Sequence, residues 1–391
     1  MRNKPRIRFK GFTEDWEQRK LGSILIEYTE KNPGNENLPV LTSSRQGLTK
    51  QEDHFGSVQR HDISDYNVIP LGFCTYRNRS DDKTFTFNIN RIVPRGLVSK
   101  FYPVFEIKNG NADFITEYLN NNIEIIKLLA VNAVGTSQVV LSLRALRNIE
   151  VTFPLKAEQV VIGNFIRKLD IYITLHQRKL EKLKLAKKAL LQKLFPKNGS
   201  QFPEIRFKGF TDAWEQRKFD EIMTFINGRA YKQDELLSDG KYKVLRVGNF
   251  YTNDSWYYSN LELDDKYYAM NGDLLYTWSA TFGPHIWKGE KVIYHYHIWK
   301  IVLKNKIDKL FALQLLEVDK ANIMSDKNGS TMVHITKQGM ENKKTILPLS
   351  LNEQKQISKF LSSIDKLITL HQRKLDKLQD MKKGLLQKMF V

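Results

Sequence analysis

Apolar residues recur at steps of three or four positions along residues 156–195, with Lys and Arg filling much of the space between them. This spacing is typical of a long amphipathic helix with a narrow apolar seam. The same pattern returns along residues 352–390. About 38 helical residues would reach roughly 57 Å, so such a helix cannot hide its seam in one small domain and needs a partner of matching length. The predicted seams are Ile162, Phe165, Leu169, Ile173, His176, Leu180, Leu183, Ala186, Leu190 and Leu194, and Ile357, Phe360, Ile364, Ile368, His371, Leu375, Leu378, Met381, Leu385 and Met389.

The two halves of the chain repeat each other around these helices. The run TLHQRKL at 174–180 recurs at 369–375, and IRFKGFTEDWEQRK at 7–20 returns as IRFKGFTDAWEQRK at 205–218. The approaches to the helices also correspond, with a Pro-Leu pair followed by Glu158-Gln159 in one half and Glu353-Gln354 in the other. A fixed period of about 195 residues indicates two structural units built alike.

Each half carries a globular segment whose interior has diverged. Strand-like runs at 38–42, 85–92 and 102–107 precede a predicted helix at 112–131, and runs at 244–247, 274–278 and 292–303 precede one at 309–322. We call the repeated segments 7–20 and 205–218 the frames. We expect Trp16 in the first frame to be a buried anchor rather than part of a DNA-contacting arm. The predicted fold is α+β, with two α/β domains in pseudo-twofold tandem repeat, separated by two long helices that form an antiparallel coiled coil. The predicted boundaries are 1–152 and 198–350 for the domains, and 153–197 and 351–391 for the spacer segments that contain the helices.

Composition narrows the class of partner. The 391 residues carry a formal net charge of +19 and are 41% hydrophobic, which favours a folded protein with a polyanionic partner, either nucleic acid or an acidic membrane surface. Cys74 is the single cysteine, which excludes disulfides within the chain and thiolate zinc clusters. No apolar run approaches 18 residues and no signal-peptide core is present, so we expect a soluble cytoplasmic protein that spans no membrane.

The whole chain resembles the specificity subunit of type I restriction-modification systems. The resemblance rests on the Pro-Leu-x-x-Glu-Gln approaches, the paired TLHQRKL helices, and the Gly-Ser/Thr turns at Gly135 and Gly329. It implies that each variable domain is a target recognition domain for one half of a split DNA sequence, and that the helices are spacers that dock methyltransferase subunits. It also implies two methyltransferase subunits and restriction/translocase subunits as partners on double-stranded DNA. No cofactor is expected on this chain, since methyl donor, ATP and magnesium would bind the partner subunits.

The repeat agrees with that implication on physical grounds. Two halves related by a pseudo-twofold axis suit two half-sites on one face of a duplex, about one helical turn apart. A rigid coiled coil would fix their separation. Because the two interiors differ, we expect different half-sites and therefore an asymmetric target with an unread middle.

Candidate base readers are polar and aromatic side chains on turns after the predicted strands. Arg can bond guanine, and Asn or Gln adenine, through paired hydrogen bonds. The first domain offers Ser43, Ser44, Arg45, Gln46, Tyr76, Arg77, Asn78 and Arg79, and the second offers Asn227, Arg229, Tyr231, Lys232, Arg246, Asn249, Trp278, Ser279 and Thr281. The helix lysines are either a solvated face or a surface for subunits or phosphates; they are Lys179, Lys182, Lys184, Lys187, Lys188 and Lys193.

Other chemistry finds little support in the sequence. His295 and His297 alternate in a predicted strand, which would place both on one face as a metal site requires, but no third ligand lies at a sensible spacing, so we interpret them as ordinary strand histidines. His176 and His371 lie on the seams, where a buried, hydrogen-bonded register pair is the favoured interpretation. Neither a phosphate-binding Gly-x-x-x-x-Gly-Lys loop nor the Asn/Asp-Pro-Pro-aromatic motif of adenine methyltransferases is present. We therefore predict no catalytic residue and no metal site. A nuclease or methyltransferase with its own site in a diverged domain, and a free-standing scaffold, are the alternatives.

Overall fold

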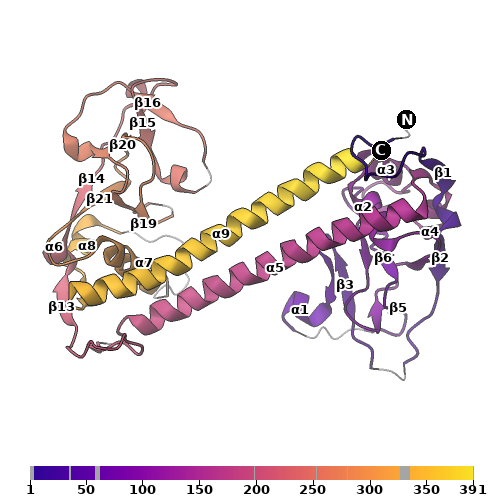
Figure 1. Ribbon diagram of the computed structural model, residues 1–391, viewed down its shortest axis with the longest axis horizontal. Helices are drawn as coiled ribbons and strands as arrows, with labels where there is room; N and C mark the ends of the chain where they lie inside the picture. The colour runs from indigo at the N-terminus through magenta and orange to yellow at the C-terminus, as the bar shows by residue number, and fades with distance from the viewer. Residues whose placement is uncertain are drawn as a thin grey trace. The chain divides into compact units, whose positions relative to one another are not determined.

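Two long helices run through the computed structural model, α5 (Lys156–Leu194) and α9 (Leu351–Met389), each one continuous helix (Figure 1). The structure describes residues 4–34, 37–57, 62–197, 199–251, 253–279, 281–325 and 335–390. It divides into two compact units, one made of residues 1–178 and 372–391 and the other of residues 179–371. Each unit therefore contains the beginning of one long helix and the end of the other.

The first unit is built on a four-stranded antiparallel sheet in the order β2-β10-β6-β8. Two-stranded sheets β3-β4, β5-β9 and β7-β11 surround it, and β1 pairs antiparallel with β12 at the boundary of the variable segment. The strands are β1 Glu17–Lys20, β2 Leu25–Tyr28, β3 Leu41–Ser44, β4 Gly47–Lys50, β5 Asn67–Pro70, β6 Cys74–Tyr76, β7 Arg79–Ser80, β8 Phe87–Ile89, β9 Arg95–Val98, β10 Val104–Ile107, β11 Val139–Val140 and β12 Glu150–Phe153. The shorter helices are α1 Gln51–Phe55, α2 Ala112–Asn121, α3 Ile123–Val131 and α4 Leu143–Asn148.

The second unit repeats this plan with a larger addition. Its four-stranded antiparallel sheet has the order β14-β21-β18-β19, its framing pair is β13-β22, and a further sheet has the order β16-β15-β20-β17. The strands are β13 Glu215–Lys218, β14 Met223–Asn227, β15 Tyr242–Leu245, β16 Tyr257–Ser259, β17 Tyr268–Ala269, β18 Leu274–Thr277, β19 Gly283–Ile286, β20 Val292–Tyr294, β21 Ile298–Leu303 and β22 Lys344–Leu347. The helices are α6 Phe219–Ile222, α7 Lys309–Ser325 and α8 Lys337–Asn342.

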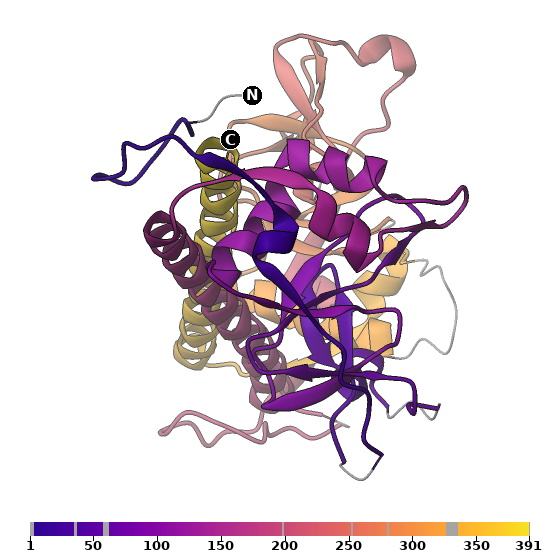
Figure 2. The ribbon, with the colours of Figure 1, turned by 90° about the vertical axis from the view of Figure 1, so that its right-hand side faces the viewer.

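The core of the first unit joins segments from both ends of the chain. Trp16, which is 2% exposed, packs edge-on against Phe114 and Tyr118 of α2, and this confirms its prediction as a buried anchor. Phe390, just beyond α9, packs edge-on against the same two rings. The end of α9 and the start of α5 accordingly lie beside the helices of this unit (Figure 2).

The repeated Glu-Gln pair at the start of each long helix has a structural role. Glu158 is fully buried and accepts two hydrogen bonds from Arg8, both of 2.7 Å. Gln159 accepts from the backbone N–H of Asn111, at the start of α2, and donates to the Pro154 carbonyl. The pair thus ties the frame, the helix α2 and the start of α5 together.

The second unit repeats this arrangement with its own residues. Arg206 donates to both carboxylate oxygens of Glu353 over 2.7 and 2.9 Å, and Trp214 Nε1 donates to the same carboxylate. Gln354 accepts from the backbone of Asp308 and donates to the Pro348 carbonyl. Because a buried carboxylate is costly without a partner, the repeated arginine accounts for the repeated IRFKGF frame.

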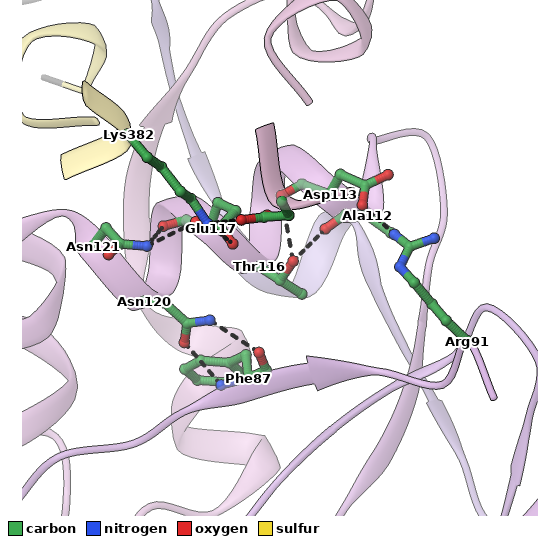
Figure 3. Close-up of polar contacts among 10 residues, drawn as sticks. Phe87, Arg91, Ala112, Asp113, Thr116, Glu117, Asn120, Asn121 and Lys382 are labelled. Carbon is green, nitrogen blue, oxygen red and sulfur yellow. Dashed lines mark hydrogen bonds and ion pairs between the residues drawn. The ribbon is translucent and has the colours of Figure 1, made fainter. Parts of the chain in front are cut away.

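A partly buried ion-pair cluster fastens the end of α9 to the first unit (Figure 3). Lys382 Nζ lies 3.1 Å from Glu117 Oε1 of α2 and 2.7 Å from Asp170 Oδ1 of α5. Burial raises the pKa of Glu117, while burial of Lys382 is more than offset by the two carboxylates, so the pKa of Lys382 is raised as well. The cluster holds three helices at one point.

The second unit contains the equivalent cluster one repeat away. Lys187 of α5 pairs with Asp365 of α9 at 2.5 Å, and Gln314 of α7 donates to the same carboxylate at 3.3 Å. Each unit thus pairs an Asp near the start of one long helix with a Lys near the end of the other, so within each unit the two helix segments run in opposite directions. Gln314 stands where the first unit has Glu117, so only the first cluster holds a second carboxylate.

Most predicted elements are present, with three differences. The seam residues are buried or half-buried except Ala186, Phe360 and Met381, which are exposed. The predicted helix at 112–131 is two helices, because the Asn122 side chain accepts from the backbone of Glu124 and Ile125 and caps a new helix. The predicted strand at 292–303 is interrupted by a turn at 295–297.

The predicted glycine turns differ in how much of them is described. At Gly135 a positive φ of 136° and the 2.4 Å from an added Cβ to the Gln138 carbonyl oxygen require glycine. Its counterpart Gly329-Ser330-Thr331 lies outside the described residues.

Candidate nucleic-acid interface

The two predicted reader loops of the first unit meet at one cavity of about 500 Å³. The hairpin between β3 and β4 contributes Ser43, Ser44 and Arg45, and the segment after β6 contributes Arg77 and Arg79. His54, Phe55 and Tyr102 complete much of its wall. The sheet thus brings together two loops that lie more than thirty residues apart in the sequence.

The arginines at this cavity differ in how much of their hydrogen-bonding capacity is used. Arg45 is held by Asp82 and Thr84. Hydrogen bonds from Thr84, Arg45 and Ser80 hold the pKa of Asp82 well below its usual range, and Thr84 has the largest effect. Arg77 and Arg79 are exposed and make no ion pair or side-chain hydrogen bond to the residues described. The Arg79 guanidinium lies 3.9 Å from the centre of the Phe101 ring, which orients it.

Some predicted readers of the first unit serve the fold instead. Tyr76 is fully buried and its hydroxyl donates to the Leu141 carbonyl at 2.8 Å, so we remove it from the candidate readers. Ser43 is 7% exposed and accepts from Asn88. Asn78 is half-buried and its backbone N–H bonds Phe101, whereas the Gln46 side chain is exposed at the hairpin tip.

In the second unit the predicted readers converge on one turn, residues 295–297. Arg229 follows β14, Arg246 follows β15 and Trp278 follows β18, and the strands bring all three to this turn. Trp278 Nε1 donates to the Tyr296 carbonyl, and its ring lies edge-on to His297 with 4.9 Å between centroids. The prediction that both histidines lie on a strand is wrong for His297, which lies in the turn, whereas His295 forms a single β-bridge with Arg229.

Both arginines near this turn have partners within the unit. Arg229 donates to both oxygens of Glu235 over 2.9 and 2.7 Å, and this pair, with the Lys232 backbone N–H, lowers the pKa of Glu235 to about 2. Arg246 donates to the Ser255 carbonyl and stacks 4.2 Å from the centre of the Tyr257 ring. Base contact by either guanidinium would first require the loss of these bonds.

The other predicted residues of the second unit form two groups. Asn227, Lys232 and Thr281 are exposed, and Ser279 is half-buried. Asn249 accepts from the Arg246 backbone and donates to Asn253 and Ser255, and Tyr231 is half-buried beside Arg229, so both organise their own loops.

The helix lysines also form two groups, those with an ion-pair partner and those without one among the described residues. Lys187 is taken by Asp365 and Lys193 by Glu204. The exposed Lys179, Lys182, Lys184 and Lys188 make no ion pair to the residues described. The seam histidines His176 and His371 are half-buried.

The residues described hold no other obvious reactive centre. Within them, no three His, Cys, Asp or Glu side chains gather where a metal ion could be held. Burial raises the pKa of the Cys74 thiol, which lies in the core of the first unit. Across the described ranges, no helix combines the length and hydropathy needed to cross a membrane.

The family described as Type I restriction modification DNA specificity domain matches this chain twice, over residues 13–185 and 211–380. The chain belongs to this family. Its members include the specificity subunits of type I restriction enzymes, which are non-catalytic. The two matches correspond to the two repeats in the sequence.

Curated relatives of this family agree with the assignment. The MjaVIII specificity subunit of Methanocaldococcus jannaschii is 31% identical over 194 residues, which span 49% of this chain and 45% of that relative. The putative MjaX specificity subunit of the same organism is 24% identical over 402 residues, covering 95% of this chain and 92% of that relative.

Solved structures of specificity subunits share the fold. The S subunit of a type I system from M. genitalium has a TM-score of 0.68 at 14% identity and covers 99% of both chains. A chain from a study of complex assembly and conformational transition in a type I system has a TM-score of 0.53 at 15% identity, covering 96% of this chain and 97% of that one.

Proposed function

We propose that this specificity subunit directs a type I restriction-modification complex to one bipartite, asymmetric DNA sequence. Each unit reads one half-site, and the two long helices set the length of the unread middle. The observation that carries the proposal is the contrast between the units. Their frames, helix approaches and sheet orders repeat, while the loops at the ends of equivalent strands carry different side chains. One scaffold therefore presents two readers of different chemistry.

The loops of the two units fit duplex DNA in different ways. The first unit offers the exposed Arg77 and Arg79, whose free guanidinium donors suit the paired acceptors of guanine in the major groove. The second offers an aromatic and imidazole surface around Trp278 and His297. The charge of +19 supplies the phosphate attraction that sequence-independent binding requires.

Repeated apolar residues on the long helices support docking of two methyltransferase subunits. On α5, Tyr172 and Leu175 are 56% and 55% exposed, and on α9 the equivalent Leu367 and Leu370 are 44% and 45% exposed. Side chains three residues apart on a helix are neighbours, and contiguous exposed apolar patches mark interaction sites. Because the patch occurs once in each unit, two copies of one partner could each find the same surface.

The rest of the proposed complex follows from this role. Restriction/translocase subunits would join the assembly, and methyl donor, ATP and magnesium would bind the partner subunits. The subunit would act in the cytoplasm, where it meets the DNA.

Methylation mapping in the host, with and without this gene, tests the proposal. Deletion should abolish methylation at one asymmetric motif made of two half-sites around an unread middle, and reintroducing the gene should restore it. A methylome unchanged by deletion would count against the proposal. Methyl transfer or magnesium-dependent cleavage by the purified chain alone would favour the enzyme alternative instead.

A further inference from the structure

One turn occupies the same place in both units, and neither turn was among the predicted readers. The second strand of the sheet β2-β10-β6-β8 is β10, and the second strand of the equivalent sheet β14-β21-β18-β19 is β21. Residues 99–102 precede β10 and residues 295–297 precede β21. We call these segments the first and second entry turns.

The two entry turns are held by equivalent backbone contacts. Tyr76 and Tyr276 are fully buried at equivalent places on β6 and β18. Two residues later, the Asn78 backbone N–H donates to the Phe101 carbonyl at 3.1 Å. In the second unit, the Trp278 backbone N–H donates to the His297 carbonyl, also at 3.1 Å. The fold therefore places both turns at the strand ends that carry the predicted readers.

The second entry turn is fixed in place from three sides. The Arg229 N–H donates to Tyr294, the Tyr296 N–H donates back to Arg229, and the His295 N–H donates to Leu245. An added Cβ at Gly228 would lie 2.3 Å from the His295 carbonyl oxygen, so only glycine permits this approach. A turn fixed by three strand ends presents its side chains in a defined geometry, which base recognition requires.

The groups that this turn exposes have unused hydrogen-bonding capacity. Tyr296 is 39% exposed, and in the described parts of the chain neither its hydroxyl nor the His297 ring makes a hydrogen bond. Burial lowers the pKa of His297, and burial with the charges of His297 and Arg246 lowers the pKa of His295 to about 4. Neutral imidazoles offer one donor and one acceptor each.

The first entry turn offers a different chemistry at the same place. Phe101 is 37% exposed and lies beneath the Arg79 guanidinium, and Lys100 Nζ lies 5.8 Å from the same ring. Tyr102 of this turn lines the cavity that Arg77 and Arg79 share. The Lys100 ammonium is paired with Asp65 at 2.8 Å, so this turn supports Arg79 through the Phe101 ring.

We propose that the two entry turns contact the bases of the two half-sites, an inference that rests on the proposed function. The Phe101 ring holds Arg79 toward the first half-site, and the Tyr296 hydroxyl and His297 ring bond base edges of the second. Arg229 and Arg246 act as supports of the second turn and do not read bases. The half-sites differ because these turns differ.

Selection from a randomised duplex library by the chain in complex with its methyltransferase subunits tests this. Tyr296→Phe removes one hydroxyl, and His297→Ala removes the imidazole. Each should lower affinity about tenfold or more and relax positions of the second half-site only. Phe101→Leu, which removes the ring beneath Arg79, should affect the first half-site only. Matched controls lie just before β6 and β18, at the ends of these strands away from the predicted readers. Leu71 and Met270 are 57% and 48% exposed there, and Leu71→Ala and Met270→Ala should change neither affinity nor motif.

The outcomes separate this inference from the proposed function. Unchanged motifs with affinities within about twofold for both Tyr296→Phe and His297→Ala would overturn the assignment of the second turn. Equal losses in Met270→Ala would also overturn it, because the effect would then not belong to the turn. Thermal melting of each variant identifies misfolding, and Tyr296→Phe keeps the ring and so keeps the packing. If the wild-type complex enriches no sequence at all, the proposed function fails instead.

Discussion

Replacing Lys382 by Met should destabilise the first unit much more than replacing its counterpart Lys187 destabilises the second. Met has a helix propensity close to that of Lys and keeps most of the apolar stem, so the loss of charge dominates each change. In the first unit Lys382 faces Glu117, whose side chain is 20% exposed, and Asp170, whose side chain is 42% exposed. In the second unit Lys187 faces Asp365, which is 37% exposed, and the third member is the neutral Gln314.

The expected magnitudes follow from what each substitution leaves behind. Removing one partner of a buried pair costs about 3–5 kcal/mol, because the remaining charge stays desolvated. With one fifth of Glu117 exposed to water, we expect about 2–3 kcal/mol for Lys382→Met. Asp365 can reach water, so Lys187→Met should cost about 1 kcal/mol or less. The difference comes from one carboxylate, that of Glu117.

A double variant isolates that carboxylate. Glu117→Gln gives the first cluster the composition of the second, so Lys382→Met combined with Glu117→Gln should recover about 1 kcal/mol or more of the loss. Because burial raises the pKa of Glu117, its protonation below neutral pH should also reduce the cost of Lys382→Met as the pH falls. Urea unfolding, with hydrogen exchange followed separately in residues 112–121 and 309–325, measures each unit. Equal losses for the two lysine variants, or no recovery in the double variant, would refute this reasoning.

Four further predictions follow from the same structure. Replacing residues 21–152 with the equivalent segment of another family member should change only one half-site of the methylated motif; a change in both would show that the units are not independent. Arg77→Ala should relax one target position at a cost of about 1–3 kcal/mol, whereas Arg229→Ala should mainly lower the stability of the second unit, because it frees Glu235; binding and melting measured together separate the two. Inserting four residues after Leu183 and four after Leu378 adds about 6 Å of rise to each helix and should lengthen the unread middle by about one or two base pairs; an unchanged middle in an active variant would show that other elements set it. Burial and Lys320 lower the pKa of His285 to about 4, so between about pH 6.5 and 4 the unfolded chain binds a proton at His285 that the folded unit does not. The second unit should therefore lose stability as the pH falls through this range. His285→Gln should reduce that loss in acid unfolding, and an unaltered pH dependence would contradict the assignment.

The long helices were predictable nearly to the residue because their seams repeat over many turns. The predicted bounds of 156–195 and 352–390 differ from the observed ones by a single position at one or both ends. The break at Asn122 also carries a readable signal, since Asn is a strong N-cap residue. The turn at 295–297 carries none, because tyrosine and histidine between β-branched residues are typical of a strand. Its conformation comes from contacts with Arg229 and Leu245, which are distant in sequence.

The loops that carry the candidate readers were predictable from the sequence, but the role of each side chain in those loops was less so. Polarity identified the hairpin tip and the segment after β6, and the structure joins them at one cavity. Polarity could not show that Tyr76 points into the core or that Glu235 occupies Arg229. The entry turns escaped prediction because Phe101 and Tyr296 acquire their neighbours only through strand pairing.

The composition of the two units has a consequence for how the chain folds as the ribosome makes it. The second unit is one continuous stretch, residues 179–371, and all of it exists before residue 372 is added. The first unit begins earlier but needs Leu386, Met389 and Phe390 to complete its core. The domain that is translated first is therefore finished last. Until then the sides of Phe114 and Tyr118 that Phe390 covers stay open, and a ribosome that stops before residue 386 leaves the second unit with all of its residues and the first unit without part of its core.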